Sequence, residues 1–156
     1  MKLNKLWKKG SSIKFTVEGR PPKKSVGSCW GNKEAEFVFK LREKALEART
    51  KAGFFDCFNG PVKLELTVYA PNITERKDTN DYVSDLDTLI AGVMESIQPA
   101  PTNPEIKIDP IFLNRIDIGS NVPLIVKDDA QVVLIIAKKI ENEKMYYEIM
   151  IKDEMV

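Results

Sequence analysis

The stretch QVVLIIAKK, residues Gln131–Lys139, contains six consecutive apolar residues and ends in two lysines. Four of the six are Val or Ile, whose branched side chains favour an extended backbone. A continuous apolar run of this kind is typical of a strand that is buried on both faces. The sequence therefore predicts a strand at the centre of a sheet. Met145–Asp153 predicts the next strand, and the two would pair as a hairpin across Ile140–Lys144.

Two stretches nearer the N-terminus place an apolar residue at every second position, which is the period of a half-buried strand. They are Ser12–Gly19 and Val62–Tyr69. Two shorter apolar stretches predict a further strand at Pro123–Lys127 and a short strand within a loop at Ile111–Ile118. The sheet is thus expected to have about five strands.

Two helices are predicted between these strands. Asp85–Ile97 has apolar residues at the i, i+3, i+4, i+7 spacing of one helical face. Asn32–Gly53 begins at a residue type that caps helices and ends at a glycine that can follow one. Four prolines predict a long insertion over residues 98–126. The element order predicts an α/β or α+β fold, with a small mixed sheet and two main helices, in a single domain over residues 12–156.

Charge is unevenly distributed along the chain. Residues 1–33 hold nine Lys and Arg but one acidic residue, whereas residues 34–156 hold 15 basic and 22 acidic residues. Residues 1–11 predict a basic arm, which either solubilises the chain or contacts a polyanion such as nucleic acid. The absence of histidine excludes catalysis by a histidine base and metal sites built on imidazole. Two cysteines, and no apolar run long enough to cross a bilayer, predict a cytoplasmic protein without a membrane partner.

Four aspartates form the candidate site. Asp85 and Asp87 stand at the start of the second predicted helix, and Asp128 and Asp129 precede the apolar strand. One interpretation is structural, because Ser84 with Asp87 matches a helix capping box and the second pair fits a turn. The other interpretation is a magnesium site for phosphodiester hydrolysis, since Mg²⁺ prefers oxygen ligands and needs few carboxylates. Both interpretations stay open at this point.

The two acidic segments together resemble a known family. SDLDTLIA at residues 84–91, followed by KDDAQVV at residues 127–133 and then by Lys138 and Lys139, resembles the RusA family of Holliday junction resolvases. That family carries D-x-D-N-x-x-K at a helix start. It then carries D-D-x-Q-V on the next core strand, which ends in a lysine.

The flanking segments agree with this resemblance. IKFTVEGRPP at residues 13–22 resembles the opening strand and Gly-x-Pro loop of the family. The resemblance extends over residues 12–153 and implies a RusA-like fold, with residues 98–126 as an insertion. Members of the family are small homodimers that bind four-way DNA junctions and cut them symmetrically with magnesium.

The resemblance implies a role for each matching residue. Asp85, Asp87 and Asp129 correspond to the essential carboxylates, and Asp128 would join them in holding Mg²⁺, or Mn²⁺ in its place. The expected activity is paired hydrolysis of phosphodiester bonds in a four-way junction by a homodimer. The residues expected to contact DNA are Arg20, Lys23, Lys24, Arg76, Lys138 and Lys139.

Two positions depart from the family pattern. Thr88 stands where the family has asparagine, and Ala91 stands where it has lysine, one helical turn after Asp87. A lysine there would offset phosphate charge or protonate a leaving oxygen, which alanine cannot do. Three hypotheses therefore stay open: an active resolvase, a DNA-binding relative that no longer cleaves, and an interaction domain whose acids only cap a helix and start a strand.

Overall fold

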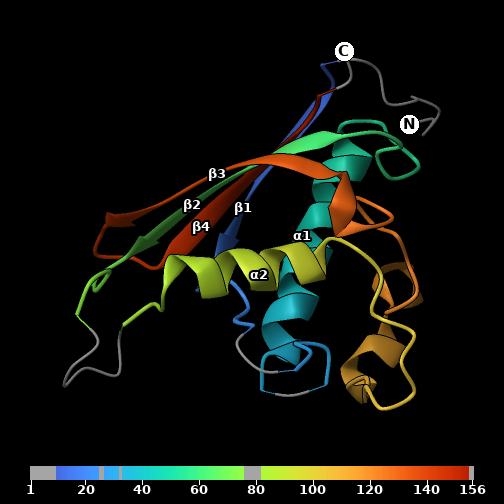
Figure 1. Ribbon diagram of the computed structural model, residues 1–156, viewed down its shortest axis with the longest axis horizontal. Coiled ribbons are helices and arrows are strands. Elements are labelled where there is room, and N and C mark those ends of the chain that lie inside the picture. The colour runs from blue at the N-terminus through green and yellow to red at the C-terminus, as the bar shows by residue number, and fades with distance from the viewer. Residues whose placement is uncertain (1–9, 25–26, 32, 76–81, 155–156) are drawn as a thin grey trace.

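The computed structural model describes residues 10–24, 27–31, 33–75 and 82–154 (Figure 1). Within these ranges four strands form one mixed sheet, and two α-helices pack against it in an α+β fold. The strands are β1 (Ser12–Glu18), β2 (Val62–Ala70), β3 (Val132–Glu141) and β4 (Tyr146–Asp153). The helices are α1 (Ala35–Lys51) and α2 (Leu86–Ser96), with short 3₁₀ helices η1 (Pro110–Asn114), η2 (Ile116–Ile118) and η3 (Asp129–Gln131).

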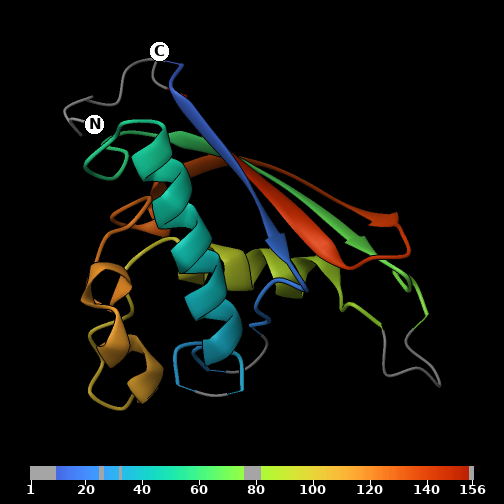
Figure 2. The same ribbon diagram turned by 180° about the vertical axis from the view of Figure 1, so that it is seen from behind.

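The sheet has the strand order β1-β4-β2-β3. β4 runs antiparallel to both of its neighbours, whereas β2 and β3 run parallel, so the chain crosses over between them through α2 and the long segment that follows. Alternate apolar residues of β1, β2 and β4 point to one face, against which both helices pack (Figure 2). This face supplies most of the buried core, including Val17, Leu64 and Ile149.

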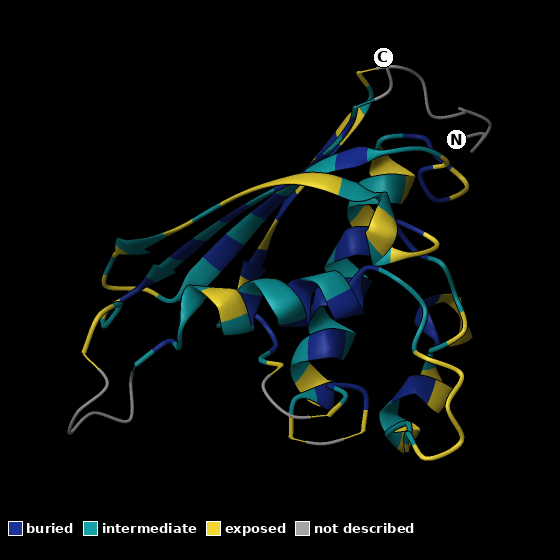
Figure 3. Ribbon diagram, viewed as in Figure 1, coloured by how far each residue is buried: buried dark blue, intermediate teal, exposed yellow. Residues whose placement is uncertain are grey.

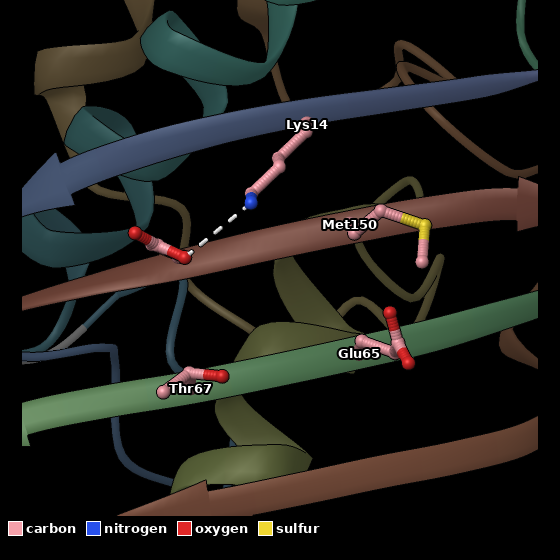
Figure 4. A pocket seen from close by; sticks show the side chains of 5 residues that line it. Lys14, Glu65, Thr67 and Met150 are labelled. Carbon is pink, nitrogen blue, oxygen red and sulfur yellow. Dashed lines mark ion pairs between the residues drawn. The ribbon is translucent and has the colours of Figure 1, made fainter. Parts of the chain in front are cut away.

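Neither α1 nor α2 covers the opposite face of the sheet. A shallow pocket on this face is surrounded by side chains of three strands (Figure 4). Lys14 on β1 lies 3.7 Å from Glu148 on β4 in an ion pair, beside Met150, Glu65 and Thr67. Because charges of both signs alternate here, the surface is a solvated sheet face, and it is separate from the acidic residues predicted to form the site.

Five predicted elements are confirmed, namely the three strands β1, β2 and β4 and the two long helices. The predicted N-cap of the first helix, Asn32, lies outside the described residues. Its predicted end is in place, because Gly53 follows α1 with φ of 90°, in the left-handed region that glycine adopts readily.

The apolar stretch 131–139 forms a strand, as predicted, but at the edge of the sheet and not at its centre. The predicted hairpin with β4 is also wrong, because β2 lies between the two strands. Four consecutive residues, Val133–Ile136, are 38–62% exposed and form a band along the edge of the sheet (Figure 3). The error has a physical source: apolar composition favours a strand, but the order of strands depends on the crossover between β2 and β3.

Two predicted strands are not formed, so the described sheet has four strands and not five. Ile111–Ile118 instead contains 3₁₀ turns, and Pro123–Lys127 is irregular. The middle of the second stretch is nevertheless fully buried. The Phe58 N–H donates to the Ile125 carbonyl at 2.8 Å, and the Ile125 N–H donates to the Ile97 carbonyl at 3.1 Å. These bonds to separate elements satisfy the backbone N–H and C=O groups without pairing to a neighbouring strand. The apolar composition here therefore reflects burial alone.

One buried arginine holds the long segment that follows α2. The Arg42 side chain, on α1, is fully buried, and its guanidinium lies 4.9 Å from the ring centroid of Trp30. It donates hydrogen bonds of 2.7–3.1 Å to the carbonyl oxygens of Ser96, Gln98, Ile118, Gly119 and Val122. Burial, together with the charge of Arg49, lowers the pKa of Arg42 to about 9, which leaves the group charged at neutral pH. A single side chain thus fixes the course of residues 96–122.

Candidate acidic site

The first aspartate pair lies where α2 begins. Asp85 is the N-cap residue with an extended backbone, and Asp87 is exposed in the first turn. Because the N-cap is Asp85 and not Ser84, the capping box considered from the sequence is not formed at those positions. The helix dipole favours negative charge at this end, so two carboxylates are stabilised there.

A tyrosine and a lysine join Asp85 from other parts of the chain. The Tyr82 hydroxyl donates to Oδ1 of Asp85 at 2.6 Å. Nζ of Lys139 lies 3.4 Å from the Tyr82 hydroxyl oxygen and donates to the Ser84 carbonyl at 3.1 Å. Lys139 is paired with Val68 of β2, whose side chain is on the buried face, so the end of β3 delivers an ammonium group to the start of α2. This cluster of Tyr82, Asp85 and Lys139 is called the 82/85/139 cluster below.

The second aspartate pair lies in the turn η3, before β3. Asp128 accepts from the Ala130 N–H at 2.9 Å and belongs to a capping box with Gln131. The Gln131 side chain also donates to the carbonyls of Phe58 and Gly60. Asp128 and Gln131 therefore shape the turn and anchor it to the chain before β2, which agrees with the structural interpretation of this pair.

The structure separates Asp129 from the first pair within one chain. The Asp129 N–H donates to Oε1 of Gln98 at 2.8 Å, and Gln98 directly follows Ile97, the C-cap of α2. Asp85 caps the opposite end of the same helix, and a helix of 11 residues is about 16 Å long. The expected convergence of Asp85, Asp87 and Asp129 is therefore not formed within one chain.

The carboxylates available to a metal ion at one place are consequently few. Among the residues that the structure describes, no group of three or more acidic or cysteine residues is arranged to hold a metal ion. Asp85 and Asp87, two residues apart at the start of α2, are the candidate ligands on one chain. This donor set fits Mg²⁺, which typically binds one or two carboxylates and completes its shell with water and substrate phosphates.

Two of the basic residues expected to contact DNA are paired with acids, and a third contacts one through its backbone. Arg20 forms a bidentate ion pair with Glu34, at 2.6 and 2.8 Å, and Nζ of Lys24 lies 3.2 Å from Oε2 of the buried Glu95. The backbone N–H of Lys23 also donates to Glu34, while burial and the charge of Arg20 lower the pKa of the Lys23 ammonium. These residues therefore hold the loop after β1 against α1 and α2.

The remaining predicted cations are placed differently. Lys138 is exposed on β3, next to Lys139 of the 82/85/139 cluster. Arg76 and residues 1–9 of the predicted arm lie outside the described residues. Lys138 is paired with Thr67 of β2, so its side chain is on the face of the sheet opposite to Lys139.

One buried acid, Glu95 on α2, holds the loop after β1 and was not found from the sequence. Oε1 of Glu95 accepts from the Ser28 hydroxyl at 2.7 Å and from the Cys29 N–H at 3.1 Å. Burial and the nearby Glu95 charge raise the pKa of the Cys29 thiol to about 12. At Gly92 a side chain would collide with the Pro22 carbonyl, so the loop contacts the helix directly. An acid on the apolar stripe of α2 was the available signal for Glu95.

Glu34 gives a prediction about acid stability. Burial alone would raise its pKa, but hydrogen bonds from the Arg20 side chain and the Lys23 N–H, with their charges, lower it below the usual value. A lowered folded-state pKa stabilises the fold above the unfolded-state pKa, and this stabilisation is lost as the pH falls through the folded-state value. Glu34→Gln is expected to lower the free energy of unfolding by about 2 kcal/mol at neutral pH. Its difference from the wild type should shrink as the pH falls below the unfolded-state pKa of a glutamate, about 4.3.

Urea unfolding at a series of pH values measures this difference. Glu36→Gln is the matched control, because Glu36 is exposed on the same turn of α1. The control should follow the wild type at every pH. A Glu34→Gln difference that stays constant throughout the acid range would show that the Glu34 charge does not stabilise the loop.

No protein-family model and no curated protein matches this chain. No helix in the described part of the chain is long and apolar enough to span a bilayer. Within the described residues, the 82/85/139 cluster joins Lys139, at the end of β3, to the Ser84 carbonyl at the start of α2.

Proposed function

We propose that this chain is a magnesium-dependent, structure-selective DNA endonuclease that resolves four-way junctions by paired phosphodiester hydrolysis. The observation that carries the proposal is the 82/85/139 cluster. In it Lys139, the last residue of the second motif, lies beside Asp85, the first acid of the other. Two segments that resemble one nuclease family are thus brought together by the end of β3 and the start of α2.

Asp85 and Asp87 would hold the cation, either Mg²⁺ or Mn²⁺. When bound, it would supply a nucleophilic water at neutral pH and offset the negative charge of the phosphate. The Tyr82 hydroxyl keeps Asp85 oriented through the 2.6 Å hydrogen bond. Lys139 contributes a positive charge at Nζ, where it can donate to a phosphate oxygen or give a proton to the leaving oxygen.

Lys139 can also replace the lysine that the family pattern has at position 91, where this chain has alanine. The family resemblance places a lysine at position 91, one turn after Asp87, and this chain has none there. Lys139 brings an ammonium group to the same end of α2 from the neighbouring strand. The proposal therefore assigns the role of the missing helix lysine to Lys139, in addition to the role of the lysine that ends the strand.

Lys139→Met tests this role. Methionine keeps much of the apolar stem but removes the ammonium group. The variant is therefore expected to cleave about 100-fold more slowly at saturating DNA, the typical effect of losing a general acid. Lys138→Met is the matched control, since Lys138 is exposed on the adjacent position of β3. It should weaken binding and reduce the salt slope by about one, with little change in the cleavage rate. Equal rate losses in both variants would contradict a specific role for Lys139.

The activity itself is tested with a synthetic four-way junction. Purified chain is incubated with the end-labelled junction in magnesium and in EDTA, with a linear duplex of the same arms as the control. Paired nicks near the branch point that require magnesium and spare the linear duplex are the expected result. Binding without nicks at any magnesium or manganese concentration would overturn the nuclease proposal.

One observation favours a second candidate, a DNA-binding relative that does not cleave. Asp129, the third essential carboxylate by resemblance, lies at the far end of α2 from Asp85 within one chain. If the chain acts alone, its site holds two of the three carboxylates. A band shift specific for branched DNA without nicks would favour this candidate.

A further inference from the structure

The backbone is strained at Ser84, the residue directly before Asp85. Its φ is 113°, a value that glycine adopts readily and that a residue with a Cβ atom rarely does. Among the described residues, every other residue with a positive φ is a glycine. A strained residue persists only where its surroundings hold it, and such residues gather at functional sites. The strain at Ser84 is located in the candidate site itself, because the Ser84 carbonyl contacts the 82/85/139 cluster.

The chain is held on both sides of Ser84. Before it, the side chain of Val83 is fully buried, and the Val83 N–H donates to the Asn72 carbonyl at 3.1 Å. After it, Asp85 is the N-cap of α2, and its carbonyl accepts from the Leu89 N–H at 3.1 Å in the first turn. Ser84 therefore joins two segments whose positions are set by other contacts, and its rare φ is what connects them.

The Lys139 ammonium group stabilises this strained arrangement. Its Nζ donates to the Ser84 carbonyl at 3.1 Å and lies 3.4 Å from the Tyr82 hydroxyl oxygen. A hydrogen bond from a charged donor is stronger than one between neutral groups. The group that would meet a substrate phosphate is thus the same group that holds the Ser84 peptide.

We propose that Ser84 is a strained switch, which a substrate phosphate releases by taking the Lys139 ammonium group. A phosphate oxygen that binds Nζ competes with the Ser84 carbonyl for the same donor. When the carbonyl loses this bond, the Ser84 backbone can relax toward a negative φ. The released strain offsets part of the lost hydrogen bond and so favours phosphate binding. The switch rests on the proposed function, which places a phosphate at Lys139.

The switch links the stability of the free protein to its affinity for phosphate. Strain destabilises the resting arrangement and is absent from the phosphate-bound one. A substitution that removes the strain therefore stabilises the free protein and weakens phosphate binding by the same free energy, because a ligand shifts an equilibrium only by its differential affinity for the two states. A purely structural residue would not weaken DNA binding when it is stabilised, and a simple DNA contact would not raise the melting temperature when it is lost.

Ser84→Gly tests this link, since glycine takes a φ of 113° without steric strain. The variant is expected to melt about 3 °C above the wild type. It should bind a fluorescently labelled four-way junction about 5-fold more weakly, which corresponds to about 1 kcal/mol. Fluorescence anisotropy in EDTA measures this affinity without cleavage of the probe. Ser84→Ala is the matched control, because it keeps the Cβ atom and the strain but lacks the hydroxyl, and it should match the wild type in both measurements.

A double-mutant cycle locates the switch at Lys139. In the Lys139→Met background there is no ammonium group for the phosphate to take from the Ser84 carbonyl. Adding Ser84→Gly to this background should therefore leave the junction affinity unchanged, although the melting temperature still rises. A 5-fold loss of affinity in this background as well would show that Ser84 acts on binding by another route, which overturns the switch.

The remaining outcomes separate the switch from the proposed function. Equal junction affinities of the wild type and Ser84→Gly would show that the phosphate uses another N–H of the Lys139 ammonium group, and the switch would be overturned. A Ser84→Gly variant that melts no higher than Ser84→Ala would overturn it too, because Ser84 would then carry no strain. A wild type that binds no junction overturns the switch and the proposed function together. A wild type that binds the junction but does not cut it in magnesium overturns only the nuclease proposal, and the measured affinities still decide the switch.

Discussion

Asp85→Asn is expected to abolish cleavage while leaving the fold and junction binding in place. Asparagine serves as an N-cap as well as aspartate does, and its side-chain oxygen can still accept the hydrogen bond from Tyr82. What it loses is the negative charge that would hold the cation. Groups that only orient a metal ligand contribute about 10–100-fold, so loss of a ligand is expected to reduce the rate by more than about 100-fold. Single-turnover cleavage of a labelled junction measures the effect.

Asp128→Asn is the matched control for this experiment. Asp128 is exposed in the turn η3, where its side chain accepts from the Ala130 N–H, and asparagine can make the same bond. The control should cut at close to the wild-type rate. The assignment of the cation site to the start of α2 would be contradicted if the control lost as much activity as Asp85→Asn. It would also be contradicted if Asp85→Asn melted at a much lower temperature, which would return Asp85 to a purely structural role.

The elements that the sequence predicts well are those whose periodicity reflects one buried face. β1, β2 and α2 each meet the core along a single face, so alternate or helically spaced apolar residues identify them directly. The long apolar run of β3 predicts a strand but not its place, because the order β1-β4-β2-β3 depends on the whole crossover. Pro123–Lys127 was expected to be a strand for its composition, but its burial comes from contacts with several elements and not from a ladder.

The candidate site was also predictable only where its residues form a local motif. Asp85 and Asp87 are two residues apart at one helix start, so a local motif is enough to find them. The separation of Asp129 depends on which end of α2 it meets, and no local pattern encodes this. The loop cations Arg20 and Lys24 are basic residues near a glycine, as a DNA-binding loop would be. Their pairing with acids on α1 and α2 becomes visible only when the helices are in place.

Arg42→Met is the substitution expected to destabilise the fold most. The guanidinium donates five hydrogen bonds from a fully buried position, and methionine fills a similar volume without a donor. Each buried carbonyl that loses its partner is destabilised by about 1–3 kcal/mol, although water can enter and restore part of the loss. We expect a decrease of about 3–5 kcal/mol in the free energy of unfolding, the range of the most disruptive single substitutions. Thermal melting should record this as a fall of roughly 10 °C.

Arg49→Met is the control, because it removes a half-buried arginine that does not hold the network. Arg49 is on the same helix and donates one hydrogen bond, to the Leu124 carbonyl at 2.8 Å, so its replacement should lower stability by about 1 kcal/mol. Arg42→Lys keeps the charge but cannot reach carbonyls on both sides, because an ammonium group lacks the planar fork of the guanidinium. It should therefore resemble Arg42→Met and not the wild type. If Arg42→Lys were as stable as the wild type, charge alone would be sufficient. The course of residues 96–122 would then be fixed by their own packing against Trp30 and the core.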